Sequence, residues 1–189
     1  MKKSLILFSL LFFAFAAVNA ASWTSWEDYM SYKDAKKAAE EAVEAGDTVN
    51  AVAAYKNAAR LAAKSGTKEI QAWQLNNAAY NSLIKKFKSG VDYDTKLAEL
   101  SAMEPGKEKI AFQAGLAAEW AAQTALLSEA KTLLNEAAGL CPAPEKEKAA
   151  EGEEAKEEAA ADSGPAAKIQ SNLDYITWVE EFIQNNKAE

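Results

Sequence analysis

The sequence predicts an all-α protein. Alanine, leucine, lysine and glutamate, which favour helix, dominate the 189 residues, and only four prolines interrupt them. Valine, isoleucine and threonine never gather into the alternating apolar and polar run that marks a half-buried strand. We therefore expect helices joined by turns and no β-sheet.

Residues 1–20 have the three parts of a cleavable, bacterial-type secretory signal peptide. Two lysines open the chain, residues 5–18 form an uncharged apolar run, and small residues precede the expected cut after Ala20. A membrane-spanning helix needs about 20 apolar residues, more than this run offers, so cleavage is favoured over an uncleaved anchor. We expect a periplasmic or secreted protein that is not inserted in a membrane after cleavage.

Four helices are expected in the next part of the chain. Ser25 and Asp28 have the spacing of a capping box at the start of the first, which either continues or breaks near Tyr32. Gly46-Asp47 and Ser65-Gly66 are stop signals on either side of the second. The expected helices cover residues 22–45, 48–64, 68–88 and 93–103.

The next helical stretch follows Pro105-Gly106. Residues 107–126 and 128–140 form two helices or one long helix, because neither glycine nor proline separates them. Large apolar residues recur near one face of this stretch at helical spacing. They are Phe112, Leu116, Trp120, Leu127 and Leu134.

An acidic low-complexity linker is expected over residues 143–164, after Cys141-Pro142. Residues 145–162 carry eight acids and three lysines, with no aromatic and no large aliphatic side chain. Such a stretch cannot bury enough apolar surface to offset the entropy of ordering, so we expect disorder.

The final segment, residues 165–189, is expected to be an amphipathic helix. Ile169, Leu173, Ile176 and Val179 recur at three- and four-residue steps between polar residues. A lone helix of this length is marginal in water, so its apolar stripe must dock. We expect it to cap the open end of the preceding helices; a partner-binding helix and a dimer contact are the alternatives.

One stretch of the chain carries a recognisable motif with the spacing G-D-x-x-x-A-x-x-x-Y-x-x-A. Its residues are Gly46, Asp47, Ala51, Tyr55 and Ala58. The motif resembles the turn and second helix of a tetratricopeptide repeat. The glycine turns the chain, the two alanines let helices approach closely, and the tyrosine fills the gap beside them.

The same internal spacing returns, without the Gly-Asp turn, at Ala130, Leu134 and Ala137. The resemblance implies a domain over 21–142 built as an α-solenoid of about three degenerate antiparallel helix pairs. These pairs would cover 32–65, 70–105 and 107–142. A generic alanine-rich helical bundle is the alternative.

The resemblance also implies a concave face lined by the first helix of each pair. That face would carry polar, adaptable side chains suited to an extended peptide or a partner helix. The candidate partner-binding residues are Lys33, Lys36, Glu40, Gln74 and Asn77, with Gln113 less certain.

Aromatic residues gather in two places that packing or binding could explain. One group is a stripe near the mature N-terminus. The other is a pair of residues, seven positions apart, in the helix expected over 68–88. Burial in the core is favoured over a face that contacts peptide or glycan, because large aromatic side chains are mostly buried. The residues are Trp23, Trp26, Tyr29, Met30, Trp73 and Tyr80.

Catalysis has little support in this composition. Histidine is absent, which removes the commonest general base, the commonest metal ligand and every Ser/His or Cys/His pair. No phosphate loop, dinucleotide fingerprint, calcium loop or zinc spacing is present. We expect no enzyme activity, no metal and no cofactor. Cys141 is expected to be a buried small residue or an unpaired thiol able to join two chains.

Charge excludes further classes of partner. The formal net charge is −7, and loss of the two signal-peptide lysines makes the chain still more acidic. Nucleic acids and anionic membranes both require a basic face. The sequence therefore predicts an exported helical-repeat scaffold that binds a protein or peptide in the cell envelope. The alternative is a structural or assembly protein that self-associates through the C-terminal helix.

Overall fold

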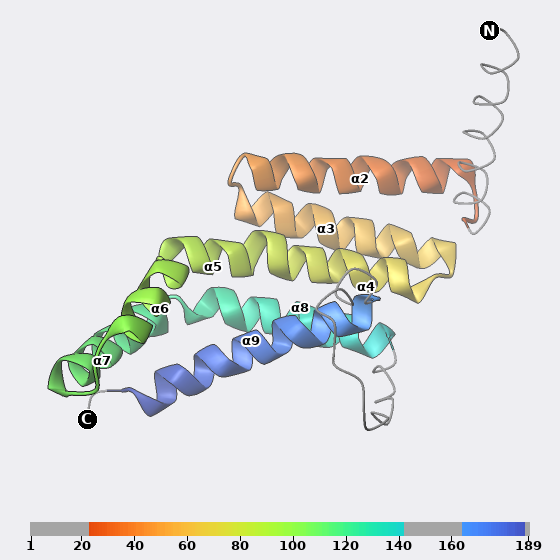
Figure 1. The fold of residues 1–189 in the computed structure, drawn as a ribbon. Coiled ribbons are helices and arrows are strands. Elements are labelled where there is room, and N and C mark those ends of the chain that lie inside the picture. The colour runs from red at the N-terminus through yellow and green to blue at the C-terminus, as the bar shows by residue number, and fades with distance from the viewer. Residues whose placement is uncertain (1–22, 142–163, 188–189) are drawn as a thin grey trace, which may run out of the picture.

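A computed structural model describes residues 23–141 and 164–187, and every regular element within these two ranges is helical. The predicted all-α class is therefore confirmed (Figure 1). The expected signal peptide, residues 1–20, and the expected linker up to residue 163 lie outside the described residues. The helices are α2 (Trp26–Glu44), α3 (Thr48–Ala62), α4 (Lys68–Asn77), α5 (Lys85–Gly90), α6 (Tyr93–Ala102), α7 (Lys107–Ala121), α8 (Thr124–Leu140) and α9 (Pro165–Asn185).

Local signals in the sequence set the ends of the first two helices. The Oγ atom of Ser25 accepts a hydrogen bond from the backbone N–H of Asp28 at 3.1 Å and caps α2, which runs unbroken past Tyr32. Gly46 turns the chain with φ of 72°, in the left-handed region that glycine enters freely. Asp47 then caps α3, because its Oδ1 accepts from the N–H of Asn50 at 3.1 Å.

The third helix is longer than expected and contains an irregularity. A π-helical segment, Ala78–Ile84, joins α4 and α5 into one continuous helix over 68–90. The helix therefore ends at Gly90, beyond the predicted stop at residue 88. Segments with this wider hydrogen-bond spacing are usually short and inserted in α-helices, as here.

The stretch 107–140 forms two helices, separated at Ala122 and Gln123. This break comes earlier than the predicted one near residue 127. The N–H of Gln123 bonds to the carbonyl of Trp120 at 3.0 Å, and its own carbonyl accepts from Leu126 at 3.2 Å. Trp120 is buried before this turn and Leu127 is buried after it. The need to bury both side chains therefore sets the position of the break, since the sequence has no glycine or proline there.

The long helices stack in the order α2, α3, α4–α5, α8 and α9, while α6 and α7 lie at one end of the stack (Figure 1). α2 and α3 form an antiparallel pair, α3 packs on α4 and the π-helical segment, and α8 covers the opposite side of that long helix. α9 lies beside α8 and also contacts α4 and α7. The largest fully buried side chains are Trp120, Phe87, Leu83, Ile84, Leu127, Leu134, Ile169, Ile176, Val91 and Val179.

The packing of α6 and α7 differs from the helix pairs expected over 70–105 and 107–142. α6 contacts α5 and α7, and α7 lies against α6 and α9, whereas α8 packs on α4 and the π-helical segment. Aromatic contacts explain the difference. The ring of Trp120 stacks on Tyr93 with centroids 4.9 Å apart and lies 4.9 Å from the ring of Phe182, which joins α7 to α6 and α9.

The apolar stripe of α9 is buried within the chain. Ile169, Ile176, Val179 and Ile183 are at most 5% exposed. Two polar contacts accompany them: the Nδ2 of Asn172 donates to the Oδ1 of Asn76 at 2.8 Å, and the Nζ of Lys131 lies 2.6 Å from Glu180. α9 therefore docks on the face of α4 and α8 that lies opposite α3. No helix in the described ranges has the length and apolar character needed to cross a bilayer.

Candidate functional site

A pocket of about 380 Å³ lies between the start of α2 and α4. α2 and α4 run in the same direction on either side of α3, so their first halves reach the same end of the stack (Figure 1). Four of the eight lining residues are aromatic, and the others are two amides, one lysine and one isoleucine. Its lining residues are Trp23, Tyr29, Tyr32, Lys36, Ile70, Trp73, Gln74 and Asn77.

Three of the five predicted partner-binding residues line this pocket: Lys36, Gln74 and Asn77. The other two lie close to it. The Nζ of Lys33 is 5.7 Å from the centroid of the Tyr29 ring, and Glu40 forms an exposed ion pair with Lys36 at 3.5 Å. Gln113 lies on α7 and is not part of the lining.

The aromatic residues near the mature N-terminus divide between packing and exposure. Trp23 is 8% exposed, and its ring lies 4.8 Å from Tyr32 and 5.8 Å from Tyr29. The expectation of core packing is wrong for Trp26 and Met30, which are 60% and 37% exposed. Both lie in the first turns of α2 and are exposed within the part of the chain that the structure describes.

Sequence reasoning missed the contribution of Tyr32 and Ile70 to the site. Tyr32 precedes Lys36 by four residues, so the two share one face of α2. Trp73 and Asn77 have the same spacing on α4. Pairing an aromatic with a polar residue four positions later could have identified both walls of the pocket, but the sequence does not tell which faces meet.

Contacts with the 3₁₀ turn after α3, Ala63–Ser65, hold the α2 wall in place. The Oγ1 of Thr24 donates to the carbonyl of Lys64 at 2.7 Å, and the Nζ of Lys64 lies 2.6 Å from the Oδ1 of Asp28. The hydrogen bond from Lys64 holds the pKa of the Asp28 carboxyl below its usual value. The start of α2 is therefore tied to the turn after α3 by two polar contacts, which favours a preformed pocket.

Gln74 is the most buried polar residue of the pocket, at 4% exposed. Its Nε2 donates a hydrogen bond to the hydroxyl oxygen of Tyr32 at 2.9 Å, while its Oε1 is buried with no partner among the described residues. Burial also raises the pKa of Tyr32, so this hydroxyl keeps its proton near neutral pH. Because the Tyr32 oxygen accepts from Gln74, its own O–H remains available to donate elsewhere.

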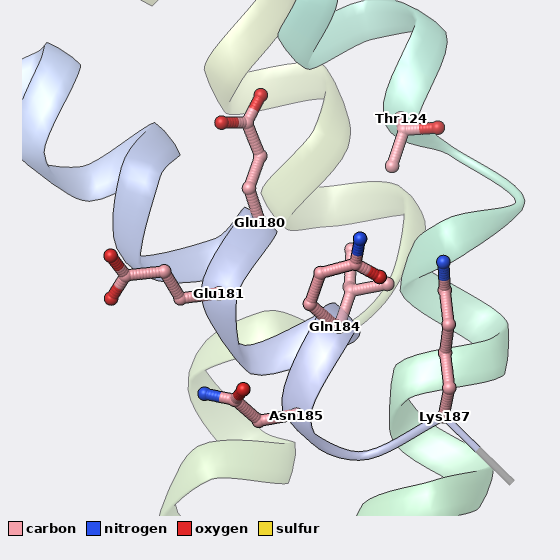
Figure 2. Close-up of a pocket in the computed structure, with 7 residues that line it drawn as sticks. Thr124, Glu180, Glu181, Gln184, Asn185 and Lys187 are labelled. Atoms are coloured by element: carbon pink, nitrogen blue, oxygen red, sulfur yellow. The ribbon is translucent and has the colours of Figure 1, made fainter.

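A second cavity of about 580 Å³ lies between the start of α8 and the end of α9. Figure 2 shows its side chains spread around the last turns of α9, with Glu181 directed away from Thr124. Glu180 is occupied by its ion pair with Lys131. Without an aromatic wall or converging polar groups, this cavity is a weaker candidate than the pocket between α2 and α4.

Cys141 and clusters of acidic side chains are the other possible centres of chemistry in the described ranges. Cys141 is a free thiol, 6% exposed, and burial raises its pKa, which disfavours the nucleophilic thiolate. No cluster of three acidic, cysteine or histidine side chains within residues 23–141 and 164–187 is placed to hold a metal ion.

The fold and the pocket together define an all-α helical protein with a preformed aromatic pocket between two parallel helices. Comparisons with protein-family models, with curated proteins and with solved structures give no match.

Proposed function

We propose that this protein is an exported helical-repeat scaffold that binds a protein or peptide partner in the cell envelope. The observation that carries the proposal is the pocket between α2 and α4, in which Lys36, Gln74 and Asn77 meet a wall of aromatic side chains. Concave, mostly apolar pockets with a few converging polar groups are the usual form of a binding site. Export rests on the signal-peptide pattern of residues 1–20.

The resemblance to tetratricopeptide repeats supports the scaffold part of the proposal at the first helix pair. Ala51 and Ala58 are fully buried and Tyr55 is 3% exposed, as close packing of two helices requires. Ala130, Leu134 and Ala137 are also fully buried on α8. We infer that the pair α2 and α3 acts as a repeat unit. We infer that the later helices up to α8 are further repeat units whose sequences match the motif less well.

The absence of histidine and the acidic charge favour a binding role without catalysis, metal, cofactor or nucleic acid. An exported protein also works where nucleotide fuel is normally absent. Binding or assembly is therefore the role that composition and pocket support together.

Site-specific photo-crosslinking in the native envelope tests this function. A photoreactive phenylalanine analogue replaces Lys36 at the pocket, and in a matched strain it replaces Lys56, an exposed lysine on α3. We expect light-dependent adducts to a discrete protein from position 36 and not from position 56. Absence of adducts at position 36, or the same adducts from both positions, would count against a partner-binding pocket.

A second candidate function is assembly of copies through α9. The observation that favours it is Trp178, which lies on α9 and is 41% exposed. Its ring stacks on Phe182 at 5.5 Å and leaves an aromatic patch at the surface. Exposed patches of this kind are frequent in interfaces. Cys141 is less suited to join two chains, because its side chain is buried at the end of α8.

A further inference from the structure

We propose that the pocket between α2 and α4 takes a proline-rich peptide segment in the polyproline II conformation. This inference rests on the proposed function and specifies the chemistry of the partner. Its grounds are the aromatic wall, the hydrogen-bond donors that line the pocket and the hydrogen bonds that hold its walls.

The wall offers flat aromatic surface to a ligand. Tyr29, Tyr32 and Trp73 line the pocket and are each partly exposed, and the ring of the buried Trp23 lies 5.8 Å and 4.8 Å from the two tyrosine rings. Grooves lined by aromatic rings receive proline-rich segments, because the proline rings pack flat and the chain is already extended before binding. A proline-rich segment therefore loses less conformational entropy on binding than a flexible peptide does.

The polar groups of the pocket match a ligand that only accepts hydrogen bonds. Proline has no backbone N–H, so a proline-rich segment presents bare carbonyl oxygens. Lys36 offers ammonium protons, Asn77 offers its amide protons, and Tyr32 has a free O–H because its oxygen already accepts from Gln74. The Oε1 of Gln74, buried with no partner among the described residues, is an acceptor that such a ligand leaves unused.

The same groups fit a glycan less well. Sugar rings also stack on aromatic side chains, but each sugar hydroxyl donates a hydrogen bond and needs an acceptor. The acceptors that line the pocket are neutral amide and tyrosine oxygens, and no carboxylate occurs among the described residues that line it. Glu40 faces Lys36 at 3.5 Å on the exposed surface of α2 and lies outside the lining.

The size and support of the pocket suit a short rigid segment. A volume of about 380 Å³ lies within the range of pockets that hold small ligands. The hydrogen bonds that Lys64 accepts from Thr24 and donates to Asp28, together with the bond from Gln74 to Tyr32, hold both walls before a ligand arrives. A preformed wall and a preformed ligand both reduce the entropy lost on binding.

The test is calorimetric titration of the mature chain with a blocked decaproline peptide. A blocked glycine-serine decapeptide and chitohexaose serve as comparison ligands for flexible peptide and glycan. We expect saturable binding of decaproline alone. Trp73→Ala should weaken it about tenfold or more, the loss typical of an aromatic anchor. Trp73→Phe, which keeps a ring, should weaken it less, and Trp178→Phe on α9 should leave it unchanged.

Three outcomes overturn the inference. They are no saturable binding of decaproline, equal binding of the glycine-serine peptide, and binding of chitohexaose that is sensitive to Trp73→Ala. If photo-crosslinks still form at position 36 in any of these cases, the scaffold function stands and only the partner chemistry is wrong. Helical circular dichroism of Trp73→Ala separates loss of binding from loss of folding, and Trp73→Phe provides the second variant if the alanine variant unfolds.

Discussion

At the scale of single residues, a buried amide pair decides how α9 meets α4. Asn76 and Asn172 are 96 positions apart in the sequence, 3% and 8% exposed, and joined by a hydrogen bond of 2.8 Å. A buried polar group is tolerated when it is hydrogen-bonded and becomes costly when it loses its partner. The pair therefore favours one register of α9 along α4 over neighbouring registers, in which each amide would be unsatisfied.

Asn172→Ala should lower the free energy of unfolding by about 1–3 kcal/mol, because it leaves the buried Asn76 amide without a partner. The double variant Asn76→Leu with Asn172→Leu should be closer to wild type, since both polar groups are removed together. Urea denaturation followed by circular dichroism measures both. Gln170→Ala, at an exposed position of α9, is the control and should change stability by less than about 0.5 kcal/mol. Equal effects at positions 170 and 172 would show that the pair adds nothing.

At the scale of elements, the turn between α2 and α3 combines two local devices. Gly46 has a backbone conformation that side chains disfavour, and Asp47 caps the following helix. A bend without these residues would leave the first N–H groups of α3 unsatisfied. The strongest match to the repeat motif therefore coincides with the turn that has the clearest physical basis.

Gly46→Ala should destabilise the protein by about 1–2 kcal/mol, because a Cβ atom is strained at positive φ even where space is open. Gly139→Ala is the matched control. Gly139 lies within α8 with no atom near its missing Cβ, so alanine should raise stability by up to about 1 kcal/mol. Thermal unfolding followed at 222 nm measures both variants. The same sign of change at the two positions would contradict the proposed role of the turn.

At the scale of the whole molecule, α9 completes the helical stack. Its four buried aliphatic residues cover α4 and α8, while Tyr175, Trp178 and Phe182 join the aromatic cluster around Trp120. Burial of each large apolar side chain is worth about 1.5–3 kcal/mol. Removal of α9 would therefore expose apolar surface on three other helices.

Deletion of residues 165–189 from the mature chain separates the two proposed functions. If α9 is an internal element, light scattering should find a monomeric full-length chain, and the truncated chain should unfold at a lower temperature or aggregate. An oligomeric full-length chain that becomes a stable monomer on truncation would favour the assembly function. If α9 is an internal element, Ile176→Ala, which opens a cavity beneath α9, should lower the free energy of unfolding by about 2–5 kcal/mol.

Much of the fold could be predicted because its signals are local. The all-α class, the caps at Ser25 and Asp47, and the left-handed turns at Gly46 and Gly66 depend on only a few neighbouring residues. Two of the five predicted site residues, Gln74 and Asn77, share one face of α4 for the same reason, since helical spacing places them there.

The tertiary structure alone decided the rest. The break at Ala122, the π-helical segment and the packing of α8 on α4 depend on which buried surfaces meet, and so does the pocket between α2 and α4. The sequence by itself determined which segments are helical and which faces are apolar. Apolar attraction has no direction, so it does not specify a partner for each face. Which faces pack together is decided by the shapes of the buried side chains, as in the aromatic cluster of Trp120. It is also decided by rare polar contacts such as the hydrogen bond between Asn76 and Asn172.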